Sequence, residues 1–155
     1  MLYVNPDDYL GDPRVFTPER NREAWRACRE LIERTFAATS QPHNFYIVCG
    51  IPGAGKTRWV KENLARFEEP AIVLDAVLTN VRARENVVAH GKSFPCRLIG
   101  IWISCALDVA LARNRARAPD QAVPDELIRT LFGDCERPNL NEGFDEVLEF
   151  EAVGQ

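Results

Sequence analysis

The sequence predicts a single α/β domain over residues 1–155, with helices on both faces of a mostly parallel sheet of about five strands. Three observations lead to this prediction. Short apolar runs alternate along the chain with stretches in which apolar residues recur at helical spacing. Two runs, 45–49 and 71–74, are apolar throughout, which is typical of strands buried on both faces of a parallel sheet. The length of 155 residues fits one such domain.

The expected elements follow in order along the chain. Residues 2–4 are a short apolar run that ends at Asn5-Pro6. Thr17 and Pro18 supply a hydroxyl cap and a proline at the first helical position, so a helix is expected over about 18–38. The remaining expected elements are strands at 45–49, 71–74, 97–103 and 144–150, and helices at 56–67, 82–90, 107–115 and from 124 onward, the last with Leu127, Ile128, Leu131 and Phe132 on one face.

Composition and charge restrict the class of protein. The formal net charge is −4, so long-range attraction to nucleic acid is not built into the whole chain, although a local basic cleft is compatible with it. No apolar run approaches the ~20 residues of a membrane span, and the N-terminus lacks a secretory signal pattern. The five cysteines include no C-x-x-C pair and are expected to be reduced thiols. These features predict a cytoplasmic protein without a membrane partner, and no pattern specifies an oligomeric state.

A glycine-rich segment directly after the run 45–49 carries the strongest functional signal. It matches G-x-x-x-x-G-K-[ST] and stands between a predicted strand and a predicted helix. Its glycines let backbone amides turn toward phosphate oxygens, and the helix N-terminus adds the positive end of its dipole. Lys56 is expected to bridge the β- and γ-phosphates, and the Thr57 hydroxyl to ligate Mg²⁺. The predicted nucleotide-binding residues of this segment are Gly50, Pro52, Gly53, Ala54, Gly55, Lys56 and Thr57.

Two groups of acidic residues follow predicted strands. Asp75 comes directly after the run 71–74, where a carboxylate can hold a metal-bound water; the alternative is a cap for the next helix. Asp7 and Asp8 follow the run 2–4. Because ligands bind beyond the carboxyl ends of parallel strands, Asp7 would lie at the site if residues 2–4 join the sheet in parallel.

The segment Arg113-Asn114-Arg115-Ala116-Arg117 ends a predicted helix and precedes Pro119. One interpretation is a lid whose arginines neutralise charge on the transferred phosphoryl group. The other is a solvated basic face that complements the helix C-terminus. We favour the lid, because a phosphoryl-transfer site without such cations would be incomplete.

The chain between about residues 45 and 150 resembles the group of P-loop kinases that includes bacteriophage and animal polynucleotide 5′-kinases and the zeta toxins. The matching segments are Gly-Ile-Pro-Gly-Ala-Gly-Lys-Thr (50–57), Ile-Val-Leu-Asp-Ala (72–76), Arg-Asn-Arg-Ala-Arg (113–117), Val-Pro-Asp-Glu-Leu-Ile (123–128) and Glu-Arg-Pro-Asn-Leu-Asn-Glu-Gly-Phe-Asp (136–145). The resemblance implies a three-layer P-loop kinase-like fold, ATP as phosphate donor, Mg²⁺ as cofactor, and Arg113 and Arg117 as lid arginines.

One departure from that family is large. Those kinases place a strand ending in Asp-x-Tyr/Phe-Arg/Lys soon after the phosphate-binding helix, and its aspartate is the general base. Here residues 4–9 resemble that segment, with Asp7 in the base position and Leu10 in place of the family's basic residue, for which Arg14 is a candidate replacement. The unit would then be moved to the N-terminus, with its strand at the sheet edge and its helix crossing over one strand.

Three hypotheses about function follow. The first is an ATP-dependent kinase acting on a hydroxyl, with a polynucleotide 5′-hydroxyl as the leading acceptor. Its catalytic residues would be Asp7, Lys56, Arg113 and Arg117, with Thr57 and Asp75 at the metal. The second is a kinase for a small hydroxylated acceptor such as a nucleotide, sugar or antibiotic. The third is a nucleotide-binding regulatory or toxin-like module. No aromatic-rich basic stripe is visible in the sequence, only scattered arginines at positions 14, 82, 84 and 97.

Overall fold

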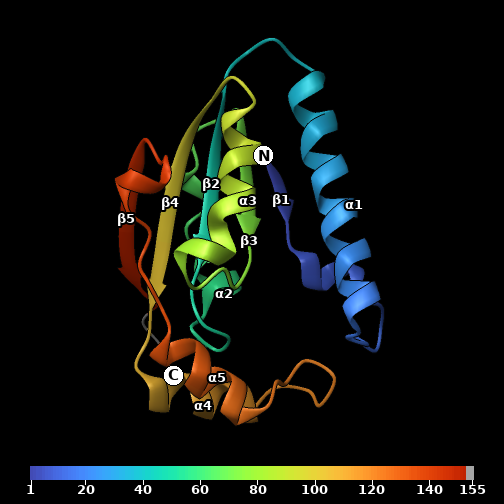
Figure 1. The fold of residues 1–155 in the computed structure, drawn as a ribbon, viewed down its shortest axis with the longest axis vertical. Helices are drawn as coiled ribbons and strands as arrows, with labels where there is room; N and C mark the ends of the chain where they lie inside the picture. The colour runs from blue at the N-terminus through green and yellow to red at the C-terminus, as the bar shows by residue number, and fades with distance from the viewer. Residues whose placement is uncertain (153–155) are drawn as a thin grey trace.

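A five-stranded, all-parallel sheet with helices on both faces forms the centre of the molecule (Figure 1), which confirms the predicted α/β fold. The structure is a computed structural model, and it describes residues 1–152. In spatial order the strands are β1 (Leu2–Val4), β3 (Ala71–Asp75), β2 (His43–Cys49), β4 (Cys96–Ser104) and β5 (Glu146–Glu151).

The N-terminal strand occupies the position expected from the rearranged strand order. β1 is an edge strand and pairs in parallel with β3, with Tyr3 opposite Val73. The chain then passes through the short 3₁₀ helix η1 (Pro6–Tyr9) and through α1 (Pro18–Ala37) to β2, so this crossover skips β3. As expected, the Thr17 side chain caps α1 by accepting a hydrogen bond from an amide of the first turn.

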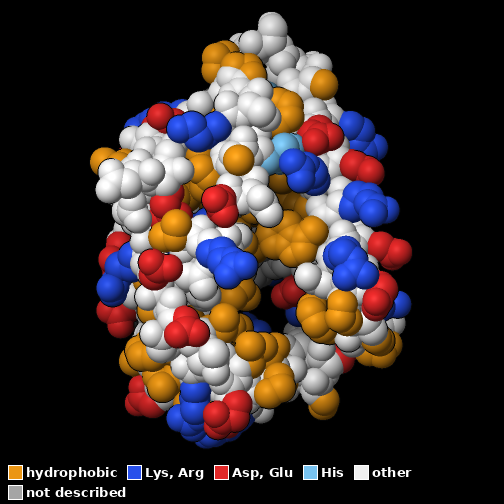
Figure 2. Space-filling model, in the orientation of Figure 1, with side chains coloured by type: hydrophobic (Ala, Val, Ile, Leu, Met, Phe, Trp, Pro, Cys, Tyr) orange, Lys and Arg blue, Asp and Glu red, His pale blue; other side chains and the backbone are white. Residues whose placement is uncertain are grey.

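Two layers of helices cover the sheet. α1 and α3 (Val81–Lys92) lie on one face, and the helices α2 (Lys56–Glu62), α4 (Leu107–Arg115) and α5 (Asp125–Gly133) on the other. Each layer has its own apolar core, because the side chains of a strand alternate between the two faces of the sheet. Figure 2 looks onto the first face, which is hollowed between α1 and α3.

The predicted apolar face of α5 is only partly buried. Ile128 is fully buried in the core, whereas Leu127 and Phe132 are 44% and 38% exposed. The four apolar residues were expected on one face of the helix, and the burial of that face is greatest at Ile128. The helix has nine residues and packs against α4.

A buried ion pair fixes the loop between β3 and α3. Arg84 is 0% exposed and binds Glu142 with a nitrogen–oxygen distance of 2.8 Å. Arg84 also donates to the carbonyl of Leu78 at 2.9 Å. The neighbouring carbonyl of Val77 accepts the amide of Gly50 at 3.1 Å, so the pair supports the start of the glycine-rich loop. The Glu-Gly-Phe segment of the family resemblance is thus part of the scaffold.

Among the described residues, no helix is both long and apolar enough to cross a lipid bilayer.

Candidate active site

The glycine-rich loop joins β2 to α2 in a conformation that exposes backbone amides. Gly53 and Gly55 have φ angles of 83° and 95°, in the left-handed region that favours glycine. A Cβ atom on Gly53 would lie 2.4 Å from the carbonyl oxygen of Ala110, so this position also requires glycine for space. Within residues 1–152, the amides of Gly53, Gly55, Lys56 and Thr57 have no hydrogen-bond acceptor. Free amides at a helix N-terminus are the arrangement that binds a phosphate group.

Lys56 lies inside this loop. Its ammonium group donates to the carbonyl oxygens of Gly50 at 2.9 Å and Ile51 at 3.1 Å. Burial lowers the pKa of Lys56, the charge of Asp75 opposes that shift, and Arg117 adds to it. A lysine held by two neutral carbonyls in a desolvated position gains strongly from an anionic ligand, because the ligand would supply the missing negative charge.

Asp75, the last residue of β3, accepts hydrogen bonds from two hydroxyl groups. One of its carboxylate oxygens accepts the Thr57 hydroxyl at 2.7 Å and the Tyr3 hydroxyl at 2.6 Å. The carboxylate is buried, with the residue 1% exposed. Asn80, not Asp75, caps α3, so the alternative interpretation of Asp75 as a helix cap does not hold.

Tyr3 was not predicted from the sequence. It stands on β1, and its phenol links that edge strand to the Asp75 carboxylate. Burial raises the pKa of Tyr3, and the neighbouring Asp75 raises it further, so the phenol stays protonated and remains a donor. Only the pairing of β1 with β3 brings the two residues together. They are 72 positions apart in the sequence, so no local sequence pattern indicates their hydrogen bond.

Asp7 lies on η1, just beyond the carboxyl end of β1. The Asn5 side chain accepts the Asp7 amide at 2.9 Å and holds this turn. The Asp7 carboxylate is exposed and lies 3.8 Å from the guanidinium of Arg14. The charge of Asp7 raises the pKa values of both Lys56 and Arg117.

Asp8 has different surroundings. Burial raises the pKa of Cys28 in α1 to about 12, and the charge of Asp8 contributes more to this rise than that of Asp7. Asp8 does not contribute to the pKa of Arg117. Of the two neighbouring acids, Asp7 is the one whose charge acts on both Lys56 and Arg117.

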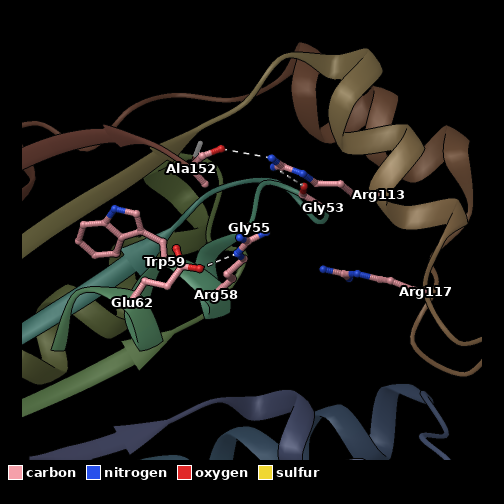
Figure 3. Close-up of a pocket in the computed structure, with 8 residues that line it drawn as sticks. All are labelled: Gly53, Gly55, Arg58, Trp59, Glu62, Arg113, Arg117 and Ala152. Atoms are coloured by element: carbon pink, nitrogen blue, oxygen red, sulfur yellow. Dashed lines mark hydrogen bonds and ion pairs between the residues drawn. The ribbon is translucent and has the colours of Figure 1, made fainter. Parts of the chain in front are cut away.

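The two predicted lid arginines lie on the other side of that loop and line a cavity of about 250 Å³ (Figure 3). Arg113 donates to the carbonyls of Ala54 at 3.1 Å and Ala152 at 3.2 Å, so it holds the loop backbone. Arg117 extends toward the loop from the segment after α4. Its guanidinium makes no hydrogen bond or ion pair with any residue in the described range 1–152. Desolvation, and then the charge of Arg14, lower the pKa of Arg117, whereas Asp7 and Asp75 raise it.

A backbone contact joins the two sides of the site. The amide of Arg14 donates to the Asp120 carboxylate at 2.9 Å. Asp120 follows the Arg117 segment, whereas Arg14 follows the Asp7 turn. The N-terminal unit and the segment that follows α4 are therefore in direct contact.

The oxygen atoms present suit magnesium rather than a metal that needs histidine or cysteine. The Thr57 hydroxyl and the Asp75 carboxylate already lie 2.7 Å apart beside the loop. Mg²⁺ in proteins is typically held by one or two such oxygens together with waters and substrate phosphates. Across residues 1–152, no group of three or more His, Cys, Asp or Glu side chains could hold a metal by itself, and the five cysteines are free thiols.

The fold and the loop together define a P-loop-like α/β protein. A scan of protein-family models gave no match to this chain, and a comparison with curated proteins gave no significant match.

Proposed function

We propose that this protein is an ATP-dependent kinase that transfers the γ-phosphate to a hydroxyl group, with a polynucleotide 5′-hydroxyl as the leading acceptor. The observation that carries the proposal is the hydrogen bond between Thr57 and Asp75 beside a loop with four unpaired amides. A hydroxyl and a carboxylate in this relation are the protein ligands with which P-loop proteins hold Mg²⁺, and waters and the phosphates of a nucleoside triphosphate supply the remaining oxygens. Asp7, on the facing side, adds the carboxylate that a hydroxyl acceptor needs.

In the proposed reaction, the amides of Gly53 and Gly55 hold phosphate oxygens. The ammonium group of Lys56 leaves its two carbonyl acceptors and binds the β- and γ-phosphates. Thr57 and Asp75 would hold Mg²⁺, which when bound would supply positive charge beside the same phosphates.

The acceptor oxygen attacks the γ-phosphorus and the bond to the β,γ-bridging oxygen breaks, so ADP leaves. Asp7 accepts the proton of the attacking hydroxyl. Arg117, which is not occupied by any ion pair within residues 1–152, neutralises charge on the transferred group. Arg113 has a different role in this scheme. Its guanidinium holds the loop by donating to the backbone carbonyls of Gly53 and Ala54.

The nucleoside part of ATP fits the cavity next to the loop. The cavity of about 250 Å³ is lined by the loop itself, by Arg113 and Ala152, and by residues of α2. Among these, Trp59 stacks on Phe150 with ring centroids 4.8 Å apart, which makes that wall rigid and apolar. An apolar wall beside two arginines suits a flat heterocycle joined to an anionic chain.

A screen with γ-labelled ATP tests the proposal. Candidate acceptors are 5′-hydroxyl oligonucleotides and small hydroxylated metabolites, and Lys56→Ala is the control for background transfer. Labelled oligonucleotide supports the leading acceptor, whereas a labelled small molecule supports the second hypothesis. ATP binding without transfer to any acceptor would favour a regulatory or toxin-like module and would contradict the kinase proposal.

A further inference from the structure

A groove of about 580 Å³ runs between α1 and α3 on the face shown in Figure 2. Its floor is apolar and includes Phe45, Leu74 and Leu78. The two helices form its walls, and hydrophobic side chains are visible in the hollow between them. The groove is larger than the cavity beside the phosphate-binding loop, and the proposed chemistry does not use it.

The α1 wall of the groove is positively charged. Arg22, Arg26 and Arg29 all line it, and no aspartate or glutamate does so among the described residues. Their spacing of four and three residues puts them on one helix face, over a length of about 10 Å. Exposed ion pairs at 3.5 Å join Arg22 to Glu19 and Arg29 to Glu33, and such pairs yield readily to an anionic ligand. Arg26 has no ion pair within the described residues.

An aromatic ring stands among these arginines. Trp25 lines the groove and is half-buried, whereas Trp59 and Trp102 are 6% and 5% exposed. Its position on α1 is one residue before Arg26, on the same groove-lining wall. A partly exposed indole beside three guanidinium groups suits a ligand that alternates flat rings with negative charges.

The groove adjoins the proposed catalytic site. Cys28 of α1 lines it, and η1, which carries Asp7 and Asp8, packs against α1. At its floor, Leu78 follows Val77, whose carbonyl accepts the amide of Gly50 in the phosphate-binding loop. A ligand in the groove would therefore reach the Asp7 side of the site.

We infer that this groove binds a single-stranded segment of nucleic acid. The backbone phosphates lie along Arg22, Arg26 and Arg29, and a base stacks on Trp25. The inference rests on the proposed kinase function and deepens it, because the strand would present its terminal hydroxyl to Asp7. An acidic protein segment also matches the charge but has no flat ring at each repeat, so the aromatic wall favours the nucleic acid.

Binding of a short 5′-hydroxyl DNA strand, labelled with fluorescein at its 3′ end, tests this inference. Fluorescence anisotropy is measured without ATP, as a function of salt. Arg26→Ala is compared with Arg34→Ala, because both arginines are exposed residues of α1, neither has an ion pair within the described chain, and Arg34 lies outside the groove. For single strands the slope of log K against log salt changes by about 0.7 per phosphate contact. Arg26→Ala is expected to reduce the slope by about that amount and to weaken binding, whereas Arg34→Ala leaves both unchanged.

Tryptophan fluorescence provides an independent measurement. Because the other two tryptophans are buried, quenching by an unlabelled strand should come from Trp25. Trp25→Phe should abolish the quenching and retain most of the affinity, since phenylalanine keeps a stacking ring. Trp25→Ala should lose about five- to a hundredfold in affinity, with thermal unfolding checked on the same sample.

Three results would overturn the groove assignment: no binding of the strand, equal effects of Arg26→Ala and Arg34→Ala, or poly-glutamate competing as well as a strand of equal charge. A different result would contradict the kinase proposal. Groove-dependent binding without phosphate transfer would leave the inference intact and remove the kinase. Phosphate transfer to a small acceptor without strand binding would support a kinase and contradict the groove assignment.

Discussion

Replacing Asp7 by asparagine tests the role of the proposed base independently of nucleotide binding by the glycine-rich loop. Asparagine keeps the size and polarity of the side chain but cannot accept a proton at neutral pH. A positioned general base contributes about 10²- to 10⁴-fold to a rate, so Asp7→Asn should lower the transfer rate by that factor. ATP affinity should not fall, because the lost negative charge lies near Lys56 and Arg117 and opposes binding of an anion.

The fold should tolerate this change. The Asp7 carboxylate is more than half exposed, and its ion pair with Arg14 is long, at 3.8 Å. Exposed pairs of this kind contribute less than about 1 kcal/mol to the free energy of unfolding. The amide of Asp7 keeps its hydrogen bond to Asn5 in the variant, since that bond involves only the backbone of Asp7.

The assay is single-turnover transfer from γ-labelled ATP, with nucleotide affinity measured on the same preparations. Asp8→Asn is the matched control: it removes the same charge one residue away, on the side of Cys28, and should be much milder. A wild-type transfer rate in Asp7→Asn would refute the assignment of Asp7 as the base. Equal losses in both variants would show that charge in this turn matters and that its position does not.

The other predictions concern the loop, the arginines and the scaffold. Lys56→Ala should lower transfer at least about 100-fold with thermal unfolding unchanged, because the lysine acts on developing phosphate charge; wild-type turnover would contradict that role. Arg117→Ala should reduce kcat more than it weakens nucleotide binding, whereas Arg113→Ala should also raise KM, because this arginine holds the loop backbone; a change in thermal stability alone would favour a structural role for either residue. Arg84→Met leaves a buried carboxylate without its ion-pair partner and should lower the free energy of unfolding by about 3–5 kcal/mol, or Tm by roughly 6–20 °C. Arg82→Ala, at an exposed position nearby, should shift Tm by no more than about 2 °C. Similar shifts of the two variants in a thermal melt would contradict the buried-pair argument.

Local patterns in the sequence were sufficient to predict most of the fold. The apolar runs of β2 and β3 marked buried parallel strands, and Thr17 with Pro18 marked the start of α1. Even the three-residue strand β1 was predictable, because a helix long enough for a crossover follows it. Periodicity gives the apolar face of α5 but not which of its residues are buried, because tertiary packing decides that Ile128 is buried and Leu127 is exposed.

The site was predictable only where its residues follow strands. The glycine-rich loop follows β2, Asp75 is the last residue of β3, and Asp7 lies three residues beyond β1. The carboxyl ends of parallel strands meet at one edge of the sheet. Tyr3 points from the middle of β1 to Asp75, and nothing in its neighbourhood along the chain indicates that contact.

The basic wall of the groove was missed for a different reason. The arginines of α1 alternate in the sequence with nearly as many glutamates, so the helix is not basic overall. Only the groove shows that Arg22, Arg26 and Arg29 share one side with Trp25. By contrast, three of the four scattered arginines noted in the sequence form ion pairs within the fold, namely Arg14, Arg84 and Arg97.

Phosphorus NMR of ATP and Mg²⁺ with a 5′-hydroxyl oligonucleotide tests the central claim most directly, because it distinguishes transfer from hydrolysis and from simple binding. The kinase proposal predicts a new phosphomonoester resonance that grows in step with ADP, and no such resonance with Lys56→Ala. ADP accompanied only by inorganic phosphate, or an unchanged ATP spectrum with every hydroxyl acceptor tried, would contradict it.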